Sequence, residues 1–336
     1  MKKVAINGLG RIGKLTLRLI ANDPSFEVVA INDLGKTEDL AYLLKYDTNQ
    51  GNFMKDQITY TDNSISIGGK EIQVYSEADA SKLPWGKLGV DLVFECSGLY
   101  TSKEKAEAHI KAGAKKVIIS APAEGDLKTI VFNVNHEILD GSEKIISGAS
   151  CTTNCLAPVL KVIHDNFTVK KGLMTTVHAY TNDQSTLDVA HRSGIAARRG
   201  RAAAENIIPT STGAAKAIGL VIPELNNKFD GMAFRVPTAT GSVIDLVLDL
   251  EKKVTAEEVN NVLKQSVNTS LDVNDDPIVS SDIIGSLYGS IVDARSTIVM
   301  NTDNGDLVKI VSWYDNEMGY VAQMIRTAKY WIRVSD

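Results

Sequence analysis

The segment SCTTNC, residues 150–155, has the residue types of a nucleophilic site. It stands where a predicted strand ends and an apolar helical segment, LAPVLKVIHDNF, begins. With Ser150 as the N-cap, Cys151 occupies the first turn of that helix, where free N–H groups stabilise a thiolate, the nucleophilic form of cysteine. The hydroxyls of Ser150 and Thr152 are available to bind an oxyanion or a phosphate. From spacing alone, a small buried cysteine near a helix start is an equally good interpretation of Cys151.

The other two cysteines are better explained as structural residues. Cys155 lies one helical turn after Cys151, but no further cluster of cysteine and histidine completes a set of four ligands, so we predict no metal site. Cys96 falls in an apolar run and is predicted to lie in the core. Three cysteines are too few for a disulfide framework. Among five histidines, His178 is a modest favourite as the base, because it stands near the end of a predicted strand at 172–180, and loops at strand ends often carry function.

A second motif, GLGRIG at residues 8–13, fits the pattern G-x-G-x-x-G. It follows a predicted strand directly, it opens a predicted helix, and Asp33 ends the next strand about 20 residues later, which is the context of a dinucleotide-binding site. Gly8 permits a tight turn, Gly10 lets a pyrophosphate approach the helix N-terminus, and Gly13 lets the helix pack on the strand. Asp33 can accept hydrogen bonds from both ribose hydroxyls and would repel a 2′-phosphate, so we predict NAD rather than NADP, with Lys36 as the nearest cation that argues for NADP.

The patterning around these motifs predicts two domains. In the first third of the chain short β-rich runs alternate with helical stretches, which indicates a parallel sheet covered on both faces. After Cys151 longer runs alternate with period two and favour an antiparallel sheet with one solvated face. We predict an α/β fold, with a Rossmann-type doubly wound parallel sheet in residues 1–150 and an α+β catalytic domain with a mostly antiparallel sheet in residues 151–316. A last helix within 317–336 is predicted to pack back on the first domain.

Single elements follow from the same patterns. Strands are predicted at 4–7, 27–33, 90–98, 115–120, 129–134, 144–148, 172–180, 241–250 and 307–314, with a hairpin over 58–75. Helices are predicted at 11–22, 102–113 with Gly113 as the C-cap, 151–166, 212–221, 255–269 and 317–333.

Composition excludes several classes of function. The 336 residues are 44 % hydrophobic and 23 % charged, which is ordinary for a soluble globular protein. A net charge of −5 and a pI near 5.6 argue against a general nucleic-acid or membrane-surface binder. No apolar run approaches the ~18 residues that span a bilayer, and the N-terminus is predicted to be a strand and not a signal peptide. We therefore expect a cytoplasmic protein without a membrane partner.

Six motifs occur here in the order found in one enzyme family: NGLGRIG, SGASCTTNCLAP, TVHAYTNDQ, PTSTGAAKAIG, FRVP and VSWYDNEMGY. Over essentially its whole length the chain resembles the phosphorylating, NAD-dependent glyceraldehyde-3-phosphate dehydrogenases of glycolysis. The resemblance implies oxidation of glyceraldehyde 3-phosphate to 1,3-bisphosphoglycerate with NAD and inorganic phosphate. It also implies a hemithioacetal and then a thioester on Cys151.

The resemblance carries roles over residue by residue. Cys151 corresponds to the nucleophile and His178 to the base. The substrate's own phosphate is held by Thr181 and Arg235. The remaining family positions are those for the attacking phosphate (Ser150, Thr152, Thr212 and Gly213), for the pyrophosphate (Gly8, Gly10, Arg11, Ile12 and Gly13), for the ribose (Asp33) and for the nicotinamide (Ser120 and Asn316).

Two segments depart from the family pattern. Ala78 stands where many members have an arginine near the adenine, so stacking by a side chain at that position is lost. The segment TATGSVIDL, residues 238–246, replaces P-N-V-S-V-V-D-L, and we expect this change not to touch the named chemistry.

Residues 191–201 contain four arginines and are locally basic. They fit either a small nucleic-acid patch or an ordered loop between the subunits of a homotetramer, as in the family. The acidic background favours the subunit interface, so we predict no nucleic-acid partner.

Two other functions remain open on the same residues. An erythrose 4-phosphate dehydrogenase would share the cysteine and the phosphate contacts but would hydrolyse the thioester. An NAD-binding sensor would use Cys151 as an oxidisable switch, although such a protein has no need for two anion sites.

Overall fold

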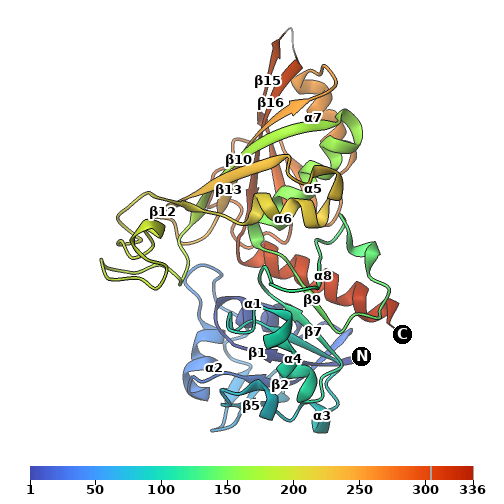
Figure 1. Cartoon of the computed structure of the whole chain (residues 1–336). Helices are drawn as coiled ribbons and strands as arrows, with labels where there is room; N and C mark the ends of the chain where they lie inside the picture. The colour runs from blue at the N-terminus through green and yellow to red at the C-terminus, as the bar shows by residue number, and fades with distance from the viewer. Residues whose placement is uncertain (303–304, 336) are drawn as a thin grey trace. The chain divides into compact units, whose positions relative to one another are not determined.

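The computed structural model describes residues 1–302 and 305–335. Contacts divide the chain into two compact units, each with its own sheet (Figure 1). Unit 1 contains residues 1–130, 136–149 and the C-terminal segment from Met324. Unit 2 contains residues 131–135 and 150–323.

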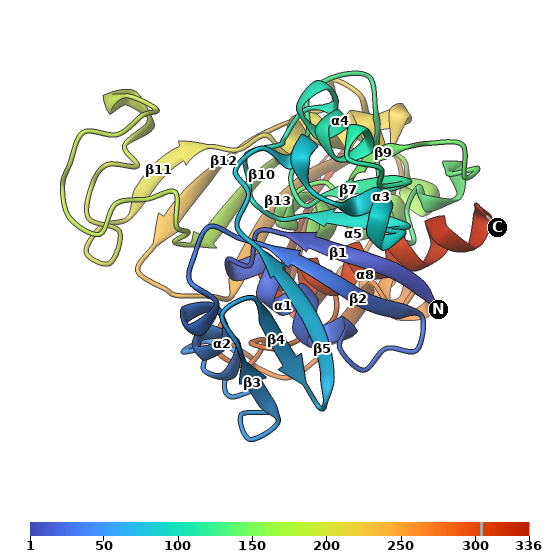
Figure 2. The ribbon, with the colours of Figure 1, turned by 90° about the horizontal axis from the view of Figure 1, so that it is seen from below.

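Unit 1 is built on a nine-stranded sheet with the order β3-β4-β5-β2-β1-β6-β7-β9-β8. The strands from β5 to β8 in this order pair in parallel, and β3, β4 and β5 pair antiparallel at one edge. Figure 2 shows β5, β2 and β1 side by side. The predicted doubly wound sheet and the hairpin are therefore confirmed. The strands are β1 (Lys2–Asn7), β2 (Phe26–Asn32), β3 (Ile58–Tyr60), β4 (Ser64–Ile67), β5 (Lys70–Tyr75), β6 (Leu92–Glu95), β7 (Lys116–Ile119), β8 (Lys128–Thr129) and β9 (Ile145–Ser147); the helices are α1 (Arg11–Ile20), α2 (Thr37–Lys45), α3 (Trp85–Leu88) and α4 (Lys103–Lys111).

Both faces of this sheet are buried. Successive side chains of a strand point to opposite faces, and the consecutive residues Ala5 and Ile6 of β1 are both fully buried. Ala5 and Val93 belong to a core cluster that Trp85 of α3 and Ala106 of α4 complete. Ile6, the next residue of β1, packs instead under α1. This burial on both faces explains why the strands of unit 1 have nearly continuous apolar runs.

One predicted strand, residues 129–134, is wrong in most of its length. Of residues 129–134, only Thr129 lies in a strand. The chain turns instead, because the side chain of Asn135 accepts a hydrogen bond of 2.8 Å from the backbone N–H of Val131, and Asn133 adopts a positive φ of 60°. Asparagine side chains commonly compete with the backbone in this way.

Unit 2 is built on a seven-stranded sheet with the order β11-β12-β10-β13-β16-β15-β14. Neighbouring strands are antiparallel except for two parallel pairs, β10 with β12 and β14 with β15. Helices α5, α6 and α7 contact strands of this sheet (Figure 1). The strands are β10 (Val169–Ala179), β11 (Ile208–Ser211), β12 (Phe229–Val236), β13 (Ser242–Leu250), β14 (Leu271–Asn274), β15 (Ser290–Thr302) and β16 (Gly305–Tyr314); the helices are α5 (Cys151–Phe167), α6 (Ala214–Val221), α7 (Ala256–Gln265) and α8 (Met318–Val334).

The alternation of β10 determines which side chains face the helices. Met174, Thr176 and His178 are buried, whereas Leu173 on the other face is 65 % exposed. His178 is therefore on the same face of the sheet as the core residues of the strand. Arg235 of β12 is the parallel register partner of His178, so both side chains project from the same face of the sheet.

Helix α8 begins in unit 2 and ends in unit 1. In unit 1, the indole N–H of Trp331 donates to Glu143 at 3.2 Å, and the Lys116 ammonium lies 4.4 Å from the centre of the Trp331 ring. No helix among the described residues is both long and apolar enough to cross a membrane.

Candidate active site

Cys151 is the first residue of α5, as the sequence predicts. The Oγ of Ser150 caps this helix by accepting a hydrogen bond of 3.0 Å from the backbone N–H of Thr153. Cys151 as a whole residue has intermediate exposure.

The thiol is paired with His178. The distance from Cys151 Sγ to His178 Nε2 is 3.4 Å, within hydrogen-bonding range for sulfur. The other ring nitrogen, Nδ1, lies 2.7 Å from the carbonyl oxygen of Ala179 and 3.0 Å from Nη1 of Arg235. A hydrogen on Nδ1 satisfies the carbonyl and leaves a lone pair on Nε2, which then accepts the thiol hydrogen.

Arg235 fixes a second polar group next to this pair. Its Nη1 donates at 3.0 Å both to the Oγ1 of Thr181 and to the carbonyl oxygen of Ala179. Thr181 in turn donates to Asp183, and Asp183 forms an ion pair with Arg199. The structure thus brings the predicted residues Thr181 and Arg235 together and adds a carboxylate and a second arginine.

Two donors in this cluster lack a hydrogen-bond partner among the described residues. They are Nε of Arg235 and Nε2 of Gln184, and both atoms are buried. The Oε1 of Gln184 accepts a hydrogen bond of 3.3 Å from the backbone N–H of Thr181, which ties it to the same loop. Buried donors without partners are costly.

The pKa values favour a neutral thiol and a neutral imidazole. Burial, and then the positive charge of Arg235, lower the pKa of His178 to about 3. Burial raises the pKa of the Cys151 thiol, and Arg235 partly opposes that shift. The position at a helix N-terminus led us to expect the opposite direction for Cys151, and the cost of desolvating a thiolate is the reason for the difference.

The remaining hydroxyls predicted to bind phosphate lie at two helices of unit 2. Thr152 is buried, and its Oγ1 lies 3.0 Å from the hydroxyl of Tyr314, which also contacts Thr176 at 2.7 Å. Thr212 accepts a hydrogen bond of 3.2 Å from the backbone N–H of Ala214, the first residue of α6. Gly213 caps that helix, and no atom lies within 4 Å of the place that a Cβ would occupy there.

The amide of Asn316 is held by the segment that departs from the family pattern. Its Oδ1 accepts hydrogen bonds from the backbone N–H of Gly241 at 3.1 Å and from Oγ of Ser242 at 2.9 Å. Ser242 Oγ also accepts from the backbone N–H of Ala179 at 3.1 Å, next to His178. The turn before β13 thus contacts Asn316 through Ser242, which the family pattern also contains, and through the backbone N–H of Gly241.

In unit 1 the glycines of the fingerprint have the expected geometry. Gly8 has a positive φ of 88°, and a Cβ on Gly13 would lie 1.8 Å from the carbonyl oxygen of Gly8. No atom lies within 4 Å of a Cβ built on Gly10, the N-cap of α1. The space in front of this helix start is therefore open, as a phosphate group requires.

Charged residues flank the fingerprint on both sides. Arg11 and Lys14 form ion pairs with Asp47, whose side chain is fully buried. Asp33 follows β2 and accepts hydrogen bonds from the backbone N–H groups of Leu9 at 2.7 Å and of Gly35 at 2.8 Å. Each carboxylate oxygen has a second lone pair for a ligand hydroxyl. Asp47 was not among the residues singled out in the sequence.

The other predicted residues of unit 1 are placed as follows. Ile12 is the second residue of α1 and is partly buried. Ser120 follows β7, and its backbone N–H donates to the carbonyl oxygen of Glu95 at 2.9 Å. The carbonyl oxygen of Ala78 accepts a hydrogen bond of 3.0 Å from the hydroxyl of Tyr100.

Burial keeps the thiols of the two other cysteines protonated. Cys155 is fully buried between Ser290 and Ser312, and burial raises its pKa to about 12. Cys96 follows β6 and does not lie within a strand; burial raises its pKa to about 12 as well. Within the described residues, no group of His, Cys, Asp or Glu side chains is arranged to hold a metal ion.

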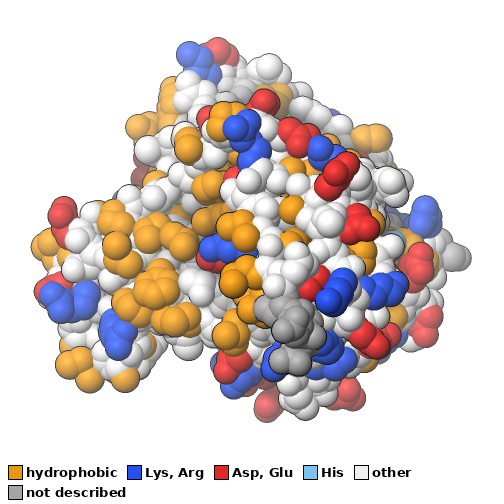
Figure 3. All heavy atoms as spheres, turned by 90° about the horizontal axis from the view of Figure 1, so that it is seen from above, with side chains coloured by type: hydrophobic (Ala, Val, Ile, Leu, Met, Phe, Trp, Pro, Cys, Tyr) orange, Lys and Arg blue, Asp and Glu red, His pale blue; other side chains and the backbone are white. Residues whose placement is uncertain are grey.

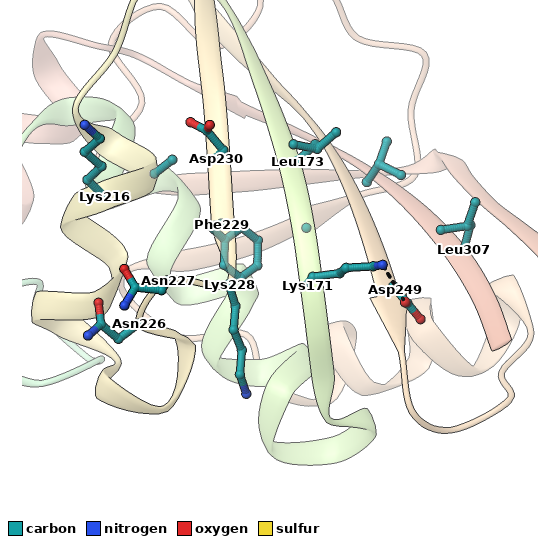
Figure 4. Close-up of a pocket in the computed structure, with 13 residues that line it drawn as sticks. Lys171, Leu173, Lys216, Asn226, Asn227, Lys228, Phe229, Asp230, Asp249 and Leu307 are labelled. Carbon is teal, nitrogen blue, oxygen red and sulfur yellow. Dashed lines mark ion pairs between the residues drawn. The ribbon is translucent and has the colours of Figure 1, made fainter. Parts of the chain in front are cut away.

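A cavity of about 840 Å³ opens on the other side of the unit 2 sheet. Figure 4 shows Leu173 of β10 and Leu307 of β16 along its wall, and Lys171 pointing toward Asp249 at 3.9 Å. None of the predicted site residues lines this cavity.

Two family models and several curated proteins match the chain. Residues 2–103 match the NAD binding domain of glyceraldehyde 3-phosphate dehydrogenase, and residues 150–316 match its C-terminal domain. Proteins named glyceraldehyde-3-phosphate dehydrogenase are 58 % identical in Clostridium pasteurianum and 57 % identical in Clostridium acetobutylicum, each over 335 residues and 100 % of both chains. The Streptococcus pyogenes protein of the same name is 54 % identical over 334 residues and 99 % of both chains.

Proposed function

This chain belongs to the glyceraldehyde-3-phosphate dehydrogenase family, and we propose that it carries out the phosphorylating oxidation of glyceraldehyde 3-phosphate with NAD, a step of glycolysis. The product is 1,3-bisphosphoglycerate. The observation that carries this proposal is the contact of 3.4 Å between Cys151 Sγ and His178 Nε2, beside the buried cation of Arg235.

Cys151 is the nucleophile and His178 the base of the first step. Nε2 of His178 takes the thiol proton as sulfur attacks the aldehyde carbon, and the proton passes to the former aldehyde oxygen to give a hemithioacetal. The neutral form of both groups before attack supports this order, since the imidazole has a free lone pair to receive the proton. The positive charge of Arg235 favours the thiolate as it forms.

His178 also serves the two later steps. It takes the hydroxyl proton of the hemithioacetal while a hydride leaves the same carbon, and a thioester results. When bound, NAD supplies the acceptor for that hydride. Inorganic phosphate then attacks the thioester carbon, the C–S bond breaks, and the imidazolium returns its proton to the sulfur of Cys151.

Two anion sites support phosphate chemistry. The unpaired donors of Arg235 and Gln184, together with Thr181, suit the phosphate of the substrate. The N-terminus of α6 with Thr212 and Gly213, and the hydroxyls of Ser150 and Thr152, suit the attacking phosphate.

The residues of unit 1 fit the dinucleotide. The open space at Gly10 and the cation of Arg11 suit a pyrophosphate, with Ile12 next in the same turn. Asp33 keeps acceptor capacity for the ribose, which favours NAD over NADP. In this proposal Ser120 and Asn316 orient the nicotinamide. Since the oxygen of the Asn316 amide is engaged by Gly241 and Ser242, the Nδ2 group is its donor.

In the same proposal residues 1–150 bind NAD, residues 151–316 carry the chemistry and the subunit contacts, and the helix within 317–336 completes the first domain. We infer a cytoplasmic homotetramer. Exposed apolar side chains support subunit contacts: Leu173, Val247 and Leu307 are 65, 36 and 43 % exposed on strands of unit 2. Hydrophobic side chains also gather over much of the left half of the face seen in Figure 3.

The proposal is tested by following NADH formation from glyceraldehyde 3-phosphate, with and without inorganic phosphate, and with NADP in place of NAD. Multiple turnovers that need both NAD and phosphate are expected. Rapid turnover without phosphate would instead indicate hydrolysis of the thioester, as in an erythrose 4-phosphate dehydrogenase. Binding of NAD without any turnover would favour a sensor.

A further inference from the structure

A chain of buried polar side chains joins the carboxyl ends of three neighbouring strands in unit 1. Asn32 at the end of β2 donates to Asn7 at the end of β1 at 2.7 Å, and Asn7 donates to Oε2 of Glu95 at the end of β6 at 2.6 Å. These side chains are at most 5 % exposed, and Glu95 is 1 % exposed. The carboxyl ends of parallel strands are where an open α/β sheet binds its ligand.

The second oxygen of Glu95 holds the loop that faces the fingerprint. Its Oε1 accepts hydrogen bonds from the backbone N–H of Ser97 at 2.7 Å and from Oγ of Ser97 at 2.5 Å. The backbone of Ser97 lies directly against Gly8, because a Cβ on Gly8 would be 2.7 Å from both N and Cα of Ser97. A shift of the loop at Ser97 would therefore displace the turn at Gly8, with which the fingerprint begins.

His109 and Trp85 determine which hydrogen-bond donors face the carboxylate of Glu95. Trp85 can only donate, and its Nε1 lies 3.0 Å from Nδ1 of His109, so Nδ1 is the acceptor. Nε2 of His109 then carries a hydrogen and donates to Oε2 of Glu95 at 2.8 Å. Glu95 thus receives four hydrogen bonds, and only a carboxylate offers acceptors to all four donors.

We propose that Glu95 is a positioning residue for the dinucleotide, which sets the turn at Gly8 through Ser97 and thereby the fingerprint for the pyrophosphate. This inference rests on the proposed binding of NAD by unit 1. A glutamine at this position replaces one acceptor oxygen by an NH₂ group. That NH₂ group would then point at one or more of the four donors and could not accept their hydrogen bonds.

The experiment compares ligands with and without a diphosphate. Binding of NAD, ADP and adenosine to the full-length protein is measured by calorimetry for the wild type and for Glu95→Gln. We expect NAD and ADP to bind about tenfold more weakly to the variant, as for a lost hydrogen bond to a charged group, and adenosine to bind equally well to both proteins. An equal loss for ADP and adenosine, or no loss for ADP, overturns the proposal.

Two further comparisons separate positioning from general destabilisation. Thr37→Val removes another buried hydrogen bond of unit 1, from Oγ1 of Thr37 to the carbonyl oxygen of Asp62 at 2.8 Å, and should leave the ratio of ADP to adenosine affinity unchanged. His109→Gln retains a donor for Glu95 and should keep the wild-type ratio, whereas His109→Leu should lower it.

If Glu95→Gln does not fold, the comparison of His109→Gln with His109→Leu tests the proposal. Equal ratios of ADP to adenosine affinity in these two variants would overturn it. Failure of the wild type to bind NAD would instead contradict the proposed function itself.

Discussion

Replacing Arg235 by glutamine removes the positive charge beside His178 and should raise the pKa of that imidazole. Glutamine keeps a side-chain N–H donor for the neighbouring carbonyl oxygen, so the change is mainly one of charge. The distance of 3.0 Å between Nη1 and Nδ1 places the charge centres about 5 Å apart, where an effective dielectric constant of about 20 gives a repulsion of about 3 kcal/mol. That energy corresponds to about 2 pKa units.

Because burial remains in the variant, the pKa of His178 should rise from about 3 toward about 5 and not reach its ordinary value. A titration of the free protein followed by NMR, with labelled histidine, measures the midpoint directly. Arg198→Gln is the matched control, since Arg198 is exposed and its side chain donates a hydrogen bond of 3.4 Å to the carbonyl oxygen of Pro209. The midpoint of that control should stay at the wild-type value.

The same substitution should also raise the pKa of the Cys151 thiol, and this makes Cys151 less reactive. Arg235 lowers the pKa of the thiol, so its loss should raise that pKa further and slow alkylation of Cys151 by iodoacetamide at neutral pH. A shift of less than about half a pKa unit for His178, together with unchanged alkylation, would show that burial alone sets both groups and would refute this reasoning.

Three further changes test other parts of the site. Cys151→Ser should abolish turnover and leave NAD binding within about twofold of wild type, whereas Cys155→Ser should retain turnover; activity in the first variant would exclude the thiol as nucleophile. Gly13→Ala places a methyl group 1.8 Å from a backbone carbonyl oxygen, so Tm and NAD affinity should both fall, and wild-type values would contradict the close packing. Ser242→Ala removes a donor to the amide of Asn316 and should raise KM for NAD about threefold.

The fingerprint was predictable because its requirements are local. The turn at Gly8, the close approach at Gly13 and the carboxylate of Asp33 all belong to one strand–helix–strand unit, so sequence spacing fixes their arrangement. Hydrophobic patterning likewise predicted the two types of sheet, since a strand buried on both faces and a strand buried on one face have different patterns.

The partners of His178 were less accessible to sequence reasoning. The side of β10 on which His178 lies follows from its spacing to Met174 and Thr176, but its neighbour Arg235 depends on the register of two strands that are far apart in the sequence. The sequence did not single out Asp183 and Arg199 as part of the site, because the basic segment of Arg199 was interpreted as a loop between subunits. Its ion pair with Asp183 shows that this segment also supports the loop of Thr181.

The protonation state of the nucleophile depends on the balance of two effects that sequence position alone does not give. A helix N-terminus favours the thiolate of Cys151, but burial opposes both the thiolate and the imidazolium of His178. In the proposed mechanism, the proton therefore stays on sulfur until a substrate provides an oxygen to receive it. In this mechanism Arg235 remains charged and stabilises each anion that forms beside it. The electrostatic stabilisation thus comes from a fixed cation and not from a thiolate–imidazolium ion pair that exists before the substrate binds.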